Sequence, residues 1–299
     1  MSDMDFLNYE SIFSELKEIF EEEKGKVKCP ISLNEYVIDE LRGADLVKLK
    51  KSRNIQSLVR NIFDLAISKI QLNDNETIDD ILSDNSYLDY NAILKGLLEV
   101  SFDEQKIDNL TCPVCSAELK DINIPYSEYK LISKLWDKEK SFKEYEIKSR
   151  PIKVDNIRLE FVLYIPTLNE FKKFIFKQLK DLNIQPQQRG ALSLSLLDPN
   201  ETLTFLTKYI VYSKLSSENN KEKEEKKFII KEKDKIYEII SLMPLKLVNS
   251  IMESVNNELK DYIPLYSTKI KCSECGEEFD VYLEPLSEFI TKVLTQNVI

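Results

Sequence analysis

Two stretches of the chain, CPVCSAELKDINIPYSEY at residues 112–129 and CSECGEEFDVYLEPLSEF at residues 272–289, carry a CxxC motif in matching context. They align without a gap at an offset of 160 residues. Beyond the cysteines, the identical pairs are Glu118 and Glu278, Pro125 and Pro285, Ser127 and Ser287, and Glu128 and Glu288. Agreement at so many positions is not expected by chance, so we infer an internal duplication.

Each copy is predicted to contain a β-hairpin, a helical pair, the CxxC knuckle, a short strand and a closing helix. The first hairpin is expected at Val27–Ile31 and Tyr36–Leu41. The second is expected at Lys148–Val154 and Ile157–Ile165, where apolar residues alternate along the second strand. The sequence therefore predicts an α+β fold, helix-dominated, built from two pseudo-repeats.

The duplication also suggests how the chain is divided. We expect an N-terminal amphipathic helix within residues 1–25, a first repeat at residues 26–143 and a second at residues 144–299. The second copy is longer, and its extra residues are expected in inserted loops at about 183–190 and 216–235. The charged stretch SSENNKEKEEKK at 216–227 lies in the later insertion, and its composition favours a flexible loop.

Helical spacing of apolar residues places the remaining elements. Helices are expected at residues 7–23, 45–70, 90–100, 128–140, 168–182 and 198–215, with a last long helix opening at Met243-Pro244. The start of the helix at 198 is marked by Asp198-Pro199-Asn200-Glu201, which has the pattern of a capping box with proline at the first helical position.

Two CxxC knuckles offer four thiolates, which is the ligand set of a closed tetrahedral zinc site. We predict one structural zinc ion held by Cys112, Cys115, Cys272 and Cys275, so that the metal joins the two repeats. Two alternatives remain open: a redox-active dithiol, and cysteines packed as small apolar side chains without a metal. The fifth cysteine, Cys29, is expected to be an ordinary core residue.

Composition excludes several functions. The chain has no histidine and five widely spaced glycines, so it lacks the means for a histidine-based catalytic triad or a glycine-rich phosphate loop. Its net charge of −10 disfavours nucleic acid as a partner. The longest uncharged stretch, Phe161–Asn169, is far shorter than the roughly 20 apolar residues that cross a bilayer, so no membrane insertion is expected. No catalytic residue is assigned, and the chain is predicted not to be an enzyme.

The order of these elements resembles the baseplate hub subunit family of T-even-type contractile-tailed bacteriophages. The residues that carry the likeness are Cys112–Cys115, Ile157–Glu170, Met243-Pro244, Cys272–Gly276 and Pro285–Phe289. The resemblance implies a non-enzymatic structural or assembly role, with other hub, tail-tube or tape-measure proteins as partners. It also implies a location in the host cytoplasm during assembly, with the virion tail baseplate as a second location.

A second function remains open, namely a zinc-ribbon regulatory protein acting in transcription or replication. It is motivated by the knuckles and by the basic residues between Lys48 and Arg60. The strands predicted after the knuckles are acidic, whereas a ribbon that binds nucleic acid would present lysine and arginine there. Charge therefore favours the structural role.

Overall fold

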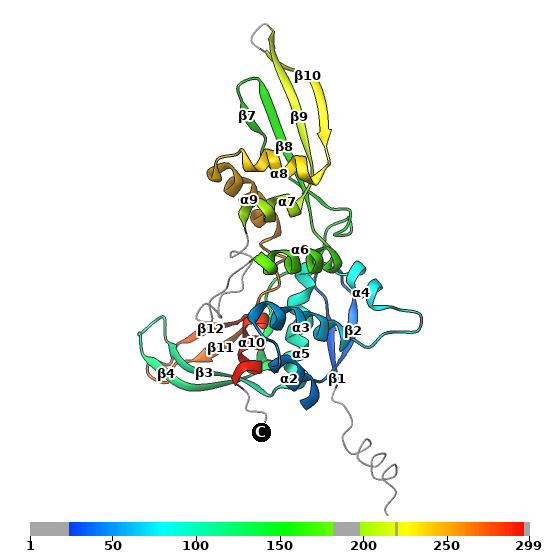
Figure 1. Cartoon of the computed structure of the whole chain (residues 1–299). Coiled ribbons are helices and arrows are strands. Elements are labelled where there is room, and N and C mark those ends of the chain that lie inside the picture. The colour runs from blue at the N-terminus through cyan, green and yellow to red at the C-terminus, as the bar shows by residue number, and fades with distance from the viewer. Residues whose placement is uncertain (1–23, 182–197, 219–220, 296–299) are drawn as a thin grey trace, which may run out of the picture.

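The computed structural model describes residues 24–181, 198–218 and 221–295, which form two lobes stacked along one long axis (Figure 1). The amphipathic helix expected at residues 7–23 and the loop expected at 183–190 lie outside the described residues. Helices and strands contribute comparably to the described part of the chain. The fold is therefore mixed α and β, and the expectation of a helix-dominated fold is wrong.

The first lobe combines a helical core with a side arm of paired strands (Figure 1). Its core elements are β1 (Lys24–Lys28), β2 (Glu35–Asp39), α2 (Gly43–Lys50), α3 (Ile55–Ser68), α4 (Ile78–Asp84), the 3₁₀ turn η1 (Tyr87–Asp89), α5 (Tyr90–Ser101), α6 (Leu168–Asp181) and α10 (Pro285–Thr295). The arm contains β3 (Glu104–Thr111), β4 (Glu118–Pro125), η2 (Tyr126–Glu128), β5 (Lys130–Leu131), β11 (Tyr266–Lys271) and β12 (Glu278–Leu283).

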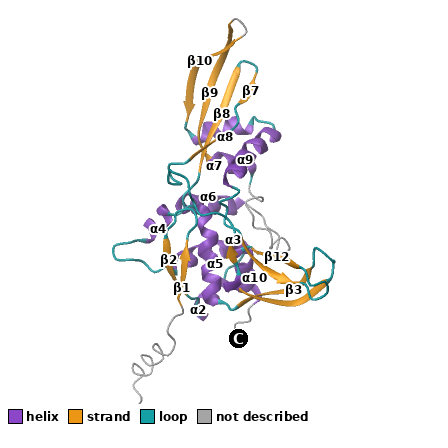
Figure 2. Cartoon of the chain, turned by 180° about the vertical axis from the view of Figure 1, so that it is seen from behind, coloured by secondary structure: helices purple, strands orange, loops and turns teal. Residues whose placement is uncertain are grey.

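The second lobe is an antiparallel sheet with strand order β10-β9-β8-β6, to which β7 adds beside β8. Helices gather at the base of this sheet (Figure 2). Its elements are β6 (Glu146–Lys148), β7 (Ile152–Val154), β8 (Ile157–Tyr164), α7 (Pro199–Leu206), β9 (Thr207–Glu218), β10 (Lys221–Ile230), α8 (Lys233–Ser241) and α9 (Leu245–Leu259). Phe161 and Ile210 of the sheet pack with Ile240 and Val248 of α8 and α9 in a second core.

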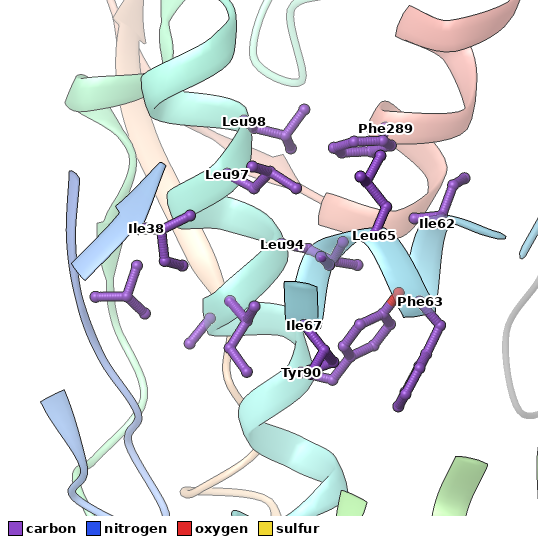
Figure 3. Close-up of a cluster of buried hydrophobic side chains, with 14 of the residues drawn as sticks. Ile38, Ile62, Phe63, Leu65, Ile67, Tyr90, Leu94, Leu97, Leu98 and Phe289 are labelled. Carbon is purple, nitrogen blue, oxygen red and sulfur yellow. The ribbon is translucent and has the colours of Figure 1, made fainter. Parts of the chain in front are cut away.

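The first core surrounds α5, whose Leu94, Leu97 and Leu98 are fully buried (Figure 3). Ile62 of α3 lies in the same core, and so does Phe289 of α10, which comes from the far end of the chain. This core therefore draws on three separate stretches, residues 24–131, 168–181 and 266–295. The predicted repeats at 26–143 and 144–299 do not coincide with the two cores.

Both predicted hairpins are present. β1 pairs antiparallel with β2, and β7 pairs with β8 across a turn at Asp155, whose φ is +51°. The helix expected at 45–70 is instead two helices, α2 and α3, because Asn54 caps a new helix by accepting a hydrogen bond from the Ser57 N–H. The helices expected at 90–100 and 168–182 are confirmed as α5 and α6.

Three other expectations are wrong. The helix opened by the Asp198 cap ends at Leu206, because Thr207, Tyr209 and Val211 begin a strand that pairs with β8. The loop expected at 216–235 is mostly the β9–β10 hairpin, whose backbone pairing does not require burial of its charged side chains. No helix forms at 128–140, where β5 instead joins the edge of β11.

A buried carboxylate fixes the turn of the first hairpin against α5. Asp89 is fully buried and accepts three backbone hydrogen bonds, from the N–H groups of Ile31 at 2.8 Å, Ser32 at 3.1 Å and Ser86 at 3.0 Å. Burial outweighs these bonds and raises the pKa of Asp89 to about 6. The carboxylate thus connects a turn to a helix start 58 residues away.

Gly96 allows α5 to approach β1 closely. A Cβ atom built at Gly96 would lie 2.0 Å from Cγ2 of Val27. We expect Gly96→Ala to lower the free energy of unfolding by about 2 kcal/mol, because overpacking outweighs the higher helix propensity of alanine. Urea unfolding followed by circular dichroism measures the change.

The matched control is Gly43→Ala in the first turn of α2, where a new Cβ would meet nothing within 4 Å. It should leave the unfolding midpoint unchanged or raise it. In a Val27→Ala background the penalty of Gly96→Ala should shrink, because the clashing methyl group is gone. An undiminished penalty there would contradict the proposed contact.

Candidate metal centre

The two CxxC motifs sit at the tips of two β-hairpins with the same strand register. In the first hairpin Thr111 pairs with Glu118, and in the second Lys271 pairs with Glu278. These pairs correspond at the offset of 160 residues found in the sequence, as do the next pairs along each ladder. The two motifs are therefore presented by equivalent backbone arrangements.

Each knuckle turn is closed by the same two backbone hydrogen bonds. In the first, Cys112 N–H donates to Ala117 O at 2.9 Å, and Ser116 N–H donates to Cys112 O at 2.9 Å. In the second, Cys272 N–H donates to Glu277 O at 2.8 Å, and Gly276 N–H donates to Cys272 O at 3.0 Å. Both turns require a left-handed residue after the second cysteine, with φ of +62° at Ser116 and +77° at Gly276.

The difference between Ser116 and Gly276 gives a paired prediction. Glycine adopts positive φ without the steric cost that a Cβ brings, which is about 1 kcal/mol. Ser116→Gly should therefore stabilise the first knuckle and raise the affinity of the chain for the shared metal ion by up to about fivefold. Gly276→Ser should destabilise the second knuckle and lower this affinity by a similar factor. Competition with a chromophoric zinc chelator measures the zinc affinity of each variant. A shift of both variants in the same direction would contradict the prediction.

The four sulfur atoms meet where the two hairpin tips face each other. Cys112 Sγ lies 3.9 Å from Cys275 Sγ, and Cys115 Sγ lies 3.7 Å from Cys272 Sγ. All four lie within 4.8 Å of one another. Tetrahedral zinc with bonds of about 2.3 Å places its sulfurs about 3.8 Å apart, whereas a disulfide needs about 2.05 Å. The four predicted residues therefore come together and could hold a metal ion.

The two cross-hairpin contacts exchange when one CxxC motif is mapped onto the other. Cys112 corresponds to Cys272 and Cys115 to Cys275, so the 3.9 Å and 3.7 Å contacts are equivalent. Exposure follows the same pattern, because the first cysteine of each motif is buried and the second is exposed. The arrangement is that of a local twofold axis through the centre of the site.

A small apolar cluster supports the cysteines from below. Leu119 packs with Cys112 and Cys272, and the neighbouring residues of this cluster are Leu110, Ala117, Ile122, Ile270 and Phe279. Both hairpins contribute, so the cluster holds the two tips together beneath the thiols. Such an apolar surround orients ligands and limits access of water to a metal centre.

The electrostatics differ among the thiols. The backbone N–H of Cys275 donates toward the Cys272 sulfur, and the pKa of Cys272 falls to about 7. At Cys115 the N–H of Ala117 acts in the same direction, but the neighbouring thiols, Cys275 first among them, outweigh it and raise the pKa to about 12. Four sulfurs this close cannot all be thiolates without a cation, and a bound metal ion would supply that charge.

The base of the arm is anchored to α10 by polar contacts. Glu288 accepts hydrogen bonds from Tyr126 Oη at 2.5 Å and Gln105 Nε2 at 3.0 Å. Lys292 Nζ donates to the carbonyl oxygen of Glu104 at 2.6 Å. From the sequence, Glu288 indicates only the duplication, through its identity with Glu128. Its role as a hydrogen-bond acceptor at the base of the arm was not predicted.

The other residues singled out in the sequence lie elsewhere. Cys29 is fully buried in the first core, as expected, and is not part of the cysteine cluster. Lys50 and Lys51 are exposed at the end of α2 and are not part of the cysteine cluster.

No family model, curated protein or solved structure matched this chain. Among the helices that the structure describes, none combines the length and apolarity needed to cross a bilayer.

Proposed function

We propose that the chain is a non-enzymatic structural or assembly subunit, stabilised by one structural zinc ion. The observation that carries the proposal is the meeting of four thiols from hairpins 160 residues apart. Four protein ligands fill the coordination sphere of tetrahedral zinc and leave no position for a substrate. A metal at this place would fasten the arm, which is formed from both halves of the chain.

The same geometry supports the internal duplication. Two knuckles with identical register, matching turn hydrogen bonds and a local twofold relation are what two copies of one ancestral hairpin would give. The likeness weakens after the hairpins, because α10 follows Pro285 whereas only a 3₁₀ turn follows Pro125. After this turn in the first copy, β5 pairs with β11 of the second hairpin.

The setting we propose is the baseplate hub of a contractile phage tail, and the resemblance of the sequence to that family is what supports it. The expected partners are other hub proteins, tail-tube subunits or tape-measure proteins, met in the host cytoplasm during assembly. An elongated molecule with a zinc-fastened side arm suits a role in joining subunits (Figure 1). The chain has no histidine, so it lacks the side chain that most often acts as a general acid or base in catalysis.

Co-expression tests this function directly. The tagged chain, produced with hub and tail-tube subunits of the same phage, should retain one of them through gel filtration, and a Cys112→Ser/Cys272→Ser double variant should lose it. Particles that assemble normally without the chain, with no subunit retained, would refute the proposal.

The regulatory alternative makes a different prediction in the same preparation. A zinc ribbon that binds nucleic acid should be retained on DNA at low salt and released as salt rises. The strands of the arm carry acidic and basic side chains in comparable numbers, and the whole chain has a net charge of −10, so we expect no retention. Salt-dependent retention would replace the structural proposal with the regulatory one.

A further inference from the structure

Aromatic rings at the edge of the second core lie beside the ammonium group of Lys138. Lys138 Nζ lies 5.3 Å from the centroid of the Tyr145 ring and 5.5 Å from that of Tyr262. Behind them, Trp136 packs edge-on against Tyr145 at 5.1 Å and tilted against Tyr262 at 5.0 Å between centroids. A cation within about 6 Å of ring centroids is attracted by their faces. These three rings, with Glu258, are called the aromatic cage below.

Carboxylates complete the aromatic cage and hold its rings in place. Glu258 Oε1 lies 3.1 Å from Lys138 Nζ and also accepts a hydrogen bond from the Tyr145 hydroxyl. The Tyr262 hydroxyl donates to Asp137. The hydrogen bond with Glu258 raises the pKa of Lys138, so the occupant stays charged. An acceptor at this distance selects a cation that carries N–H groups over a quaternary ammonium ion.

Two walls of the cage are buried, whereas its occupant is partly exposed. Trp136 is 7% and Tyr262 6% exposed, and the indole Nε1 donates to the carbonyl oxygen of Lys140 at 2.9 Å. The Lys138 side chain is 31% exposed and belongs to a segment without regular structure. A surface cavity of about 420 Å³ is lined by Lys138 and Tyr145, so a ligand can approach the ammonium position from solvent.

We propose that the aromatic cage is a binding site for a primary alkylammonium group, with Lys138 as the internal group that such a ligand displaces. The group can come from a free amine or from a lysine side chain of a partner protein. The site is independent of the cysteine cluster, so it can hold whether or not the proposed function does.

The test uses Trp136, the single tryptophan of the chain, as a reporter in the cage. Lys138→Ala removes the internal competitor. Titration of this variant with n-butylammonium chloride at constant ionic strength should change Trp136 emission saturably, with a dissociation constant at least tenfold lower than in the wild-type chain. Tetramethylammonium should bind at least tenfold more weakly than n-butylammonium, because it has no N–H to donate to Glu258.

Two controls locate the response. Lys140→Ala changes a neighbouring exposed lysine and should titrate as the wild-type chain does. Adding Glu258→Gln to Lys138→Ala should reduce the preference for n-butylammonium over tetramethylammonium, because a neutral amide oxygen is a weaker acceptor than a carboxylate. If Lys138→Ala does not give the wild-type circular dichroism spectrum, Lys138→Gln, which keeps the stem without the charge, should still bind n-butylammonium more tightly than the wild-type chain.

An acetylated and amidated Gly-Lys-Gly peptide distinguishes the two sources. Binding at least tenfold tighter than n-butylammonium supports a partner's lysine, and equal binding supports a free amine. A folded variant that binds n-butylammonium no better than the wild-type chain, or no better than tetramethylammonium, would overturn the proposal.

Discussion

Replacing Cys112 by serine is expected to release the metal from the whole chain, and replacing Cys272 should do the same. Each substitution removes one of four ligands from the same ion, and apparent binding free energies of structural zinc sites are about 10–16 kcal/mol. Loss of one thiolate should lower the affinity at least about a hundredfold. Native mass spectrometry should show one zinc per wild-type chain and none in either variant.

Structural consequences should follow in the arm rather than in the cores. Without the metal, the two hairpin tips are held only by the small cluster around Leu119. Limited proteolysis should therefore cut the arm at least tenfold faster in both variants, and a strong chelator should reproduce this in the wild-type chain. Far-ultraviolet circular dichroism should change little, because the helices lie outside the arm.

Cys29 supplies the matched control. It is buried in the first core, far in the sequence from both knuckles, so Cys29→Ala should keep one zinc per chain. If Cys112→Ser lost the metal while Cys272→Ser retained it, the shared site would be wrong. Two zinc ions per wild-type chain would contradict it as well.

Removing the Asp89 side chain should cause the largest loss of stability in the first lobe. Asp89→Ala leaves the N–H groups of Ile31, Ser32 and Ser86 without their acceptor. A buried donor without a partner costs about 1–3 kcal/mol, so the free energy of unfolding should fall by about 3 kcal/mol or more. Urea unfolding followed by circular dichroism measures it, and Asp74→Ala, at an exposed loop position, should change little.

Asp89 also predicts a pH dependence of stability. Its pKa is about 6 in the folded chain, against an ordinary value of 3.8. The folded chain therefore binds this proton more tightly than the unfolded chain, so the carboxyl group's contribution to stability is present below about pH 4 and is lost as the pH rises to about 6.

Asp89→Asn isolates this contribution, because an amide does not titrate. The difference in unfolding free energy between the wild-type chain and Asp89→Asn should decrease from about pH 4 to pH 6 and stay level above it. A difference that grows over this range would mean that the folded-state pKa of Asp89 is lowered.

The metal centre was readable in the sequence because its signal is local. Each CxxC turn fixes two sulfurs within four residues, and the repeated context around it predicted that the two pairs belong together. The sequence did not reveal the register that brings Cys112 opposite Cys275, because that depends on how two hairpins pack.

Long-range partners account for most of what sequence reasoning missed. β9 begins with several β-branched and aromatic residues, among them Thr207, Tyr209 and Val211, which favour a strand. An apparent capping box before it favoured a helix through to Leu215. Pairing with β8 decided the outcome. Asp89 looked like any acidic residue before a helix, because the N–H groups that it accepts from lie in a turn far earlier in the chain. The aromatic cage likewise joins Lys138 to Glu258 across more than a hundred residues.

The assembly of the first core from three separate stretches has a consequence for synthesis. On the ribosome, the side of α5 that carries Leu97 and Leu98 emerges long before Phe289 and Val293, which cover it in the finished fold. The second lobe needs nothing beyond Tyr262 and can close earlier. The nascent chain therefore carries an open apolar surface through most of translation, and aggregation competes with folding at this surface until the last helix arrives.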